Sequence, residues 1–120
     1  MPKKINIKQK FSKFSELWSP KVIAEMNDYQ FKIVKIHGEF VWHKHDETDE
    51  VFIVIDGSMK IQFRKKTINL NQGELLIVPK GVEHKPSAAD LCKIMIVEPR
   101  GVMNTGNIKN ELTAKNDIWI

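Results

Sequence analysis

The chain has 120 residues, of which 42% are hydrophobic and 28% charged, as is typical of one globular domain. Its single cysteine excludes an internal disulfide, and it has no stretch with the length and apolar character of a membrane span or secretory signal. The net charge of +4 arises in residues 1–35, which hold eight lysines against three acidic residues. No aromatic-basic motif accompanies these lysines, so we interpret them as a solvated face. We expect a cytoplasmic protein that binds neither nucleic acid nor membrane.

The N-terminal segment has the periodicity of a short amphipathic helix. Its apolar residues recur at intervals of three and four and share one helical face: Ile7, Phe11, Phe14 and Trp18. Asn6 is a suitable N-cap, and Pro20 ends the pattern. We therefore predict a helical extension over residues 1–20, with its apolar face on its own sheet or on a partner subunit.

Beyond this segment, short runs with a period of two alternate with turn signals such as Asp56-Gly57 and Asn71-Gln72-Gly73. The expected strands are residues 22–26, 29–36, 40–45, 50–55, 59–64, 67–70, 74–78, 83–87 and 91–98. Many short strands at regular spacing predict an all-β sandwich or barrel over residues 21–98. We expect the tail, residues 99–120, to dock through its apolar end on the barrel or on a partner subunit.

Three histidines and one glutamate are the candidate metal ligands. His43 and His45 stand at i and i+2, so both point to the same side of an extended strand. Glu50 opens the next expected strand, and His84 is aimed by the turn at Pro79-Lys80-Gly81. Imidazole and carboxylate together bind divalent iron, manganese, zinc, nickel or copper. We predict one divalent transition metal ion at this site, with two open positions if the ion is octahedral.

The spacing of these residues resembles the two motifs of the cupin family. The first motif is Gly, a spacer, His-x-His, three or four residues, Glu, six residues and Gly, and its matches are Gly38, His43, His45, Glu50 and Gly57. The second is Gly, five residues, Pro-x-Gly, two residues and His, and its matches are Gly73, Pro79, Gly81 and His84. Two departures are visible: Gly38 stands one residue closer to His43 than usual, and Ala88 replaces a closing Asn that is not a ligand. The resemblance implies a double-stranded β-helix, or jelly-roll barrel, with a 3-His-1-Glu metal centre.

The resemblance leaves the reaction open. Cupins of this kind include iron-dependent dioxygenases, sugar-phosphate isomerases, and decarboxylases or lyases acting on small acids. A non-catalytic ligand-binding or sensor domain, or a barrel that uses its ion only for stability, is the alternative. No general base is evident beside the ligands unless Glu50 leaves the metal and acts as one. We expect a small molecule as the ligand and a homodimer as the assembly, because edge strands and apolar chain ends need cover.

The remaining residues of note are expected to pack the barrel rather than to take part in metal binding or catalysis. Six apolar side chains are predicted to line the interior: Phe52, Met59, Ile61, Phe63, Ile77 and Ile94. Cys92 alternates with Ile94 and is expected to be buried. His37 is expected to be exposed or hydrogen-bonded outside the ligand set, and Trp42 to pack on the side opposite the histidines.

Overall fold

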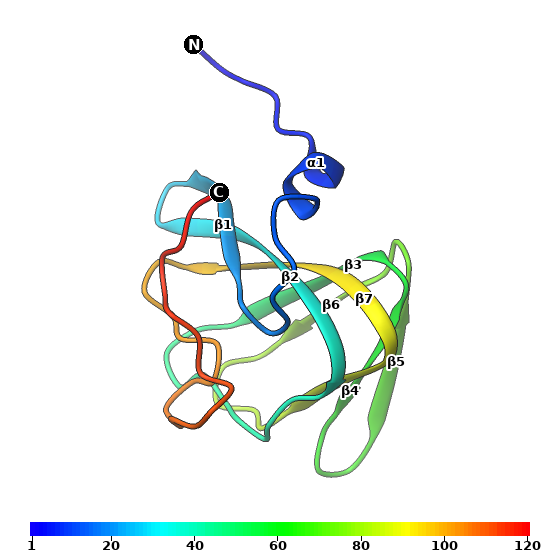
Figure 1. The fold of residues 1–120 in the computed structure, drawn as a ribbon. Helices are drawn as coiled ribbons and strands as arrows, with labels where there is room; N and C mark the ends of the chain where they lie inside the picture. The colour runs from blue at the N-terminus through cyan, green and yellow to red at the C-terminus, as the bar shows by residue number, and fades with distance from the viewer.

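The computed structural model describes residues 1–120 as a barrel of seven strands with one short helix outside it (Figure 1). The helix is α1 (Ile7–Phe11), and the strands are β1 (Lys21–Met26), β2 (Tyr29–Glu39), β3 (Glu50–Asp56), β4 (Ser58–Gln62), β5 (Thr67–Asn71), β6 (Leu75–Val78) and β7 (Lys85–Pro99). All pairings are antiparallel, with the order β1-β2-β7-β3-β6 and with β4 between β5 and β7. The all-β prediction is confirmed, and no helix is long and apolar enough to cross a membrane.

Strand β7 joins the two sides of the barrel. Its first residues pair with β4, and its later residues pair with β3, while β2 runs along both parts. Two separate strands were expected here, over residues 83–87 and 91–98. The structure has one continuous strand instead, with a register shift in the β2–β7 pairing between Ile36 and Gly38, where β7 holds the extra residues and the ladder can bend.

Helix α1 is shorter than the predicted helix. Asn6 caps it as expected, its Oδ1 accepting a hydrogen bond from the Gln9 amide at 2.9 Å, but the helix ends at Phe11. Trp18 has a φ of 57°, which no right-handed helix permits, and its amide donates to the Lys35 carbonyl at 2.9 Å. The helical spacing fails because its residues belong to two cores: Phe11 packs outside the sheet and Trp18 inside the barrel.

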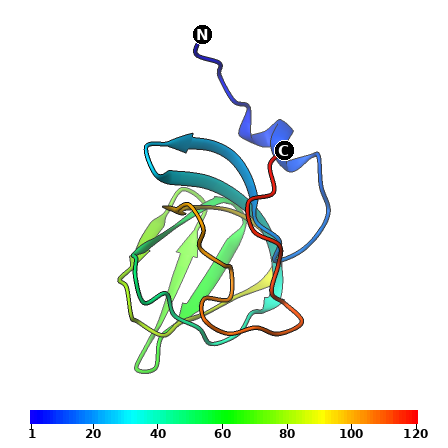
Figure 2. The same ribbon diagram turned by 90° about the vertical axis from the view of Figure 1, so that its left-hand side faces the viewer.

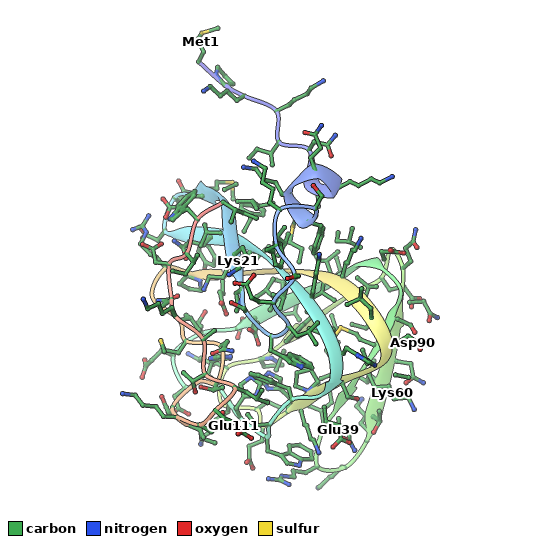
Figure 3. All side chains as sticks on the ribbon, viewed as in Figure 1. Met1, Lys21, Glu39, Lys60, Asp90 and Glu111 are labelled. Atoms are coloured by element: carbon green, nitrogen blue, oxygen red, sulfur yellow. The ribbon has the colours of Figure 1, made fainter.

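The inner core is formed by 14 buried side chains, most of them from inward positions of the strands, together with Trp18 and Phe40 from the connections. Side chains occupy the space within the ribbon (Figure 3). The prediction for Ile77 was wrong: its side chain is 52% exposed on the outside. Val78 is buried instead, because it stands opposite Glu50 in the β3–β6 register and shares that residue's inward face.

The end of the chain lies along β1 (Figure 2). The Val22 amide donates to the Ile118 carbonyl at 2.7 Å, and the Ile120 amide donates back to the Val22 carbonyl at 3.2 Å. The Lys10 ammonium, just outside the barrel, donates to the Ile120 carbonyl at 2.7 Å. These bonds connect both ends of the chain to the outer edge of the sheet.

Candidate metal centre

The four predicted ligands come together inside the barrel, and all are buried. Their candidate ligand atoms lie within 4.8 Å of one another. His43 and His45 belong to the connection between β2 and β3, Glu50 is the first residue of β3, and His84 directly precedes β7. The strand expected over residues 40–45 does not form. His43 makes only a two-bond bridge to His84, with its amide donating at 3.0 Å and its carbonyl accepting at 2.9 Å.

Two of the imidazole rings are oriented by the backbone. Nδ1 of His43 lies 2.9 Å from the Val41 carbonyl oxygen, and Nδ1 of His84 lies 3.0 Å from the Val82 carbonyl oxygen. A carbonyl oxygen only accepts, so each Nδ1 carries the proton and donates it. In the neutral ring, Nε2 then holds a free lone pair, as metal coordination requires.

The atoms at the centre of the cluster present more lone pairs than protons. Glu50 Oε1 lies 3.3 Å from His84 Nε2 and 3.4 Å from His45 Nε2, and His45 Nε2 has no hydrogen-bond partner. With Nδ1 of His84 protonated, its Nε2 and the Glu50 oxygen both offer lone pairs to the same small space. A shared cation gives all three atoms a partner, so this donor set fits a divalent transition metal.

The protonation states also suit a metal. Burial, together with the neighbouring His84, lowers the pKa of His43 to about 4, so the ring is neutral at pH 7. Burial alone would raise the pKa of Glu50, but the neighbouring His45 and His84 side chains outweigh burial and hold that pKa well below its usual value. A neutral imidazole and an ionised carboxylate are the forms that bind metal.

The cluster lies between two spaces. On the inner side, a cavity of about 30 Å³ is lined by His43, Glu50 and Glu98 among mostly apolar residues. On the outer side, His45 lines a surface groove of about 530 Å³ that runs between residues 45–48 and 99–107. His43 and Glu50 therefore face the apolar interior, and His45 borders the surface groove.

One buried ion pair beside the cluster was missed at the sequence level. Lys32 and Glu98 are each 2% exposed, and Lys32 Nζ lies 2.8 Å from Glu98 Oε2. Burial, followed by the nearby Glu50 carboxylate, raises the pKa of Glu98 well above its usual value.

The interpretation of the N-terminal lysines as a solvated face was wrong for Lys21 and Lys32, which are buried. The signal was present, because Lys32 continues the inward alternation of Val34 and Ile36.

The remaining candidates lie outside the cluster, as expected. Cys92 is buried, and burial with the nearby Asp56 raises the pKa of its thiol to about 11. His37 is exposed, and its carbonyl accepts from the Trp18 indole at 3.1 Å. The Trp42 ring packs under the Arg64 guanidinium, whose carbon lies 3.9 Å from the ring centroid.

His43, His45, Glu50 and His84 form a buried tetrad. The fold and this tetrad define a small antiparallel β-barrel with a candidate metal site in its interior. The family model described as "Cupin domain" matches residues 31–98, which include the whole tetrad. The chain belongs to this cupin family, and the predicted fold is confirmed.

Three relatives extend this comparison. The uncharacterized protein YdbB of Bacillus subtilis (strain 168) is 36% identical over 80 residues, which are 66% of this chain and 65% of that protein, less than two thirds of its length. The crystal structure of a cupin-2 domain containing protein from Shewanella frigidimarina is 64% identical, with a TM-score of 0.79 over 80% of this chain and 94% of that chain. Protein NMB1881 from Neisseria meningitidis is 31% identical, with a TM-score of 0.75 over 81% of this chain and 99% of that chain.

Proposed function

We propose that this cupin binds one divalent transition metal ion through His43, His45, Glu50 and His84 and uses it on a small molecule. The observation that carries the proposal is the unprotonated Nε2 of His84 at 3.3 Å from the Glu50 carboxylate, an arrangement that a shared cation stabilises. The unpartnered Nε2 of His45 supports it independently.

The ion, when bound, supplies Lewis-acid or redox chemistry at the positions its protein ligands leave open. Glu50 contributes the negative charge that partly neutralises a dication. The apolar side chains around the inner cavity, Phe40 and Phe52 among them, exclude bulk water and strengthen charge interactions there. This setting suits a dioxygenase-like reaction or a sugar isomerase- or lyase-like reaction on a small substrate.

A second candidate is a barrel that binds its ion, or a small effector, without catalysis. The size of the inner cavity, about 30 Å³, favours it, since that space accommodates only about two water-sized groups. Substrate turnover by the metal-loaded protein decides between the two. A screen of small acids and sugars, run in air and without oxygen, also separates an oxygenase from an isomerase or lyase.

Metal analysis of the purified protein tests the site itself. We expect close to one ion per chain in the wild type and loss of most of it in His45→Ala and His84→Ala. His37→Ala is the matched control, because His37 is exposed and lies outside the tetrad. A wild-type protein that holds no ion, both as isolated and after reloading, would contradict the proposal.

We also propose that two copies of the chain associate. Strand β6 is an edge of the sheet, and Leu75 and Ile77 on its outer face are 58% and 52% exposed. Exposed apolar edges favour association. Sedimentation velocity should give the mass of a dimer, and a monomer at all concentrations would refute this assembly.

A further inference from the structure

Glu98 stands near the end of β7 and faces the inner cavity beside the tetrad. One carboxyl oxygen, Oε2, accepts from Lys32, whose ammonium also donates to the Val102 carbonyl at 3.2 Å. The other oxygen, Oε1, is buried and accepts no hydrogen bond, and the Glu98 carboxyl lies near the Glu50 carboxylate. The cavity therefore contains an unpaired polar atom on a side chain that Lys32 holds in place.

The barrel does not need this arrangement for its own stability. A buried polar atom without a partner is destabilising, and a buried ion pair is often no more stabilising than apolar residues of similar size. The two preceding inward positions of β7, Ile94 and Ile96, are apolar and packed in the core. A charged residue at the third such position, with one oxygen left free, indicates a role toward a ligand.

A hydroxyl is the group that fits this oxygen. A hydroxyl donates to a carboxylate and accepts from a carboxylic acid, so the hydrogen bond forms in either protonation state of Glu98. The cavity of about 30 Å³ accommodates about two water-sized groups, and its other walls are mostly apolar. His43 and Glu50 line the same cavity, so a group bound there lies beside two of the proposed metal ligands.

We propose that the inner cavity is a subsite for the hydroxyl group of a small hydroxylated ligand, with Glu98 Oε1 as its hydrogen-bond partner and Lys32 as the residue that positions Glu98. This inference rests on the proposed metal site, which holds a second polar group of the same ligand. The ligand class is thus a small molecule with a metal-binding group and a hydroxyl a few atoms away.

The test compares 3-hydroxypropionate with butyrate, which has the same shape but a methyl group in place of the hydroxyl. Both are titrated into the full chain loaded with Co²⁺, and the visible spectrum of the ion reports binding. We expect the wild type to prefer 3-hydroxypropionate by about tenfold, the contribution of one buried hydrogen bond. Glu98→Leu combined with Lys32→Met, which replaces the whole pair by apolar side chains, should abolish this preference. Co²⁺ binding should be retained.

The outcomes separate this inference from the proposed function. A wild type that takes up no Co²⁺ refutes the metal site. A wild type that binds Co²⁺ but does not prefer the hydroxylated acid, or binds neither acid, overturns the subsite alone. A double variant that still prefers 3-hydroxypropionate also overturns the subsite alone. If the double variant does not fold, Glu98→Met combined with Lys32→Met serves instead, because a thioether is at most a weak hydrogen-bond acceptor. Its preference should be lost while its Co²⁺ spectrum without ligand stays unchanged; an undiminished preference overturns the subsite.

Discussion

Replacing Lys32 by methionine tests how much the buried ion pair beside the proposed metal ligands contributes to the free energy of unfolding. Lys32 Nζ lies 2.8 Å from Glu98 Oε2, and both side chains are almost fully buried. Methionine retains most of the apolar stem and removes the charge, so Glu98 is left without its cation. Removing one partner of a buried pair costs about 3–5 kcal/mol, a large part of the roughly 5–15 kcal/mol that stabilises a domain.

The cost should depend on pH in a defined direction. The pKa of Glu98 is already raised by burial and by Glu50, and losing the Lys32 ammonium, which lowers it, raises it further. A carboxyl whose pKa is higher in the folded than in the unfolded state favours folding only at low pH. This contribution to stability is lost as the pH rises from the pKa of the unfolded state, 4.5, through the higher pKa of the folded state. The penalty of Lys32→Met should therefore be larger at pH 8 than at pH 5.

Urea unfolding with a chelator present measures this penalty for the wild type, Lys32→Met, and Lys32→Met combined with Glu98→Leu. We expect the single variant to lose about 3–5 kcal/mol at pH 8 and clearly less at pH 5. The double variant should recover most of the loss at pH 8, because no unpaired charge remains. Equal losses of the single variant at the two pH values, or a double variant as unstable as the single one, would refute the reasoning.

Three further predictions concern the tetrad and its surroundings. A Cβ at Gly106 would clash with the carbonyl of Lys44, which lies between two of the proposed ligands, whereas a Cβ at Gly101 meets nothing within 4 Å. Both glycines have positive φ, so Gly101→Ala controls for backbone strain. Gly106→Ala should therefore weaken metal affinity more than Gly101→Ala, as measured by competition with a chelator. The pKa of His43 is about 4 in the folded protein and 6.5 in a free side chain, so the unfolded chain binds a proton at higher pH than the folded one. The free energy of unfolding of the metal-free protein should therefore fall by about 3 kcal/mol between pH 6.5 and pH 4, relative to that of His43→Leu. Metal at 100 times its Kd should stabilise the wild type by about 2.7 kcal/mol in thermal unfolding and should not stabilise His84→Ala.

The tetrad could be predicted because two of its histidines show a local strand pattern and all four residues match the spacing of the cupin motifs. His43 and His45 point to a common ion from the i, i+2 relation alone, and the cupin motifs associate Glu50 and His84 with them. The barrel followed from alternation and turns. In contrast, Ile77 of β6 was expected to line the interior, and all four residues of that strand are apolar. The register opposite Glu50, which a single sequence does not specify, places Val78 inside and Ile77 outside.

The errors at the N-terminus and at Lys32 have different origins. Local periodicity reports that a residue is buried, but not against which surface, so Phe11 and Trp18 were assigned to one helix although they enter different cores. Lys32 was assigned by its charge to solvent, although its position continues the buried pattern of β2. Its partner Glu98 is 66 residues away, and no local pattern connects the two.

The orientation of the ligands does not depend on the strand that was expected around them. In both His43 and His84, Nδ1 bonds to the carbonyl oxygen two residues earlier in the chain, at Val41 and Val82. This repeated bond needs only an extended backbone, and the amide–carbonyl bridge between His43 and His84 supplies that backbone without a longer ladder. Because the acceptors are main-chain atoms, side-chain substitution at either valine leaves them in place. Disturbing the ring orientation therefore requires moving the backbone.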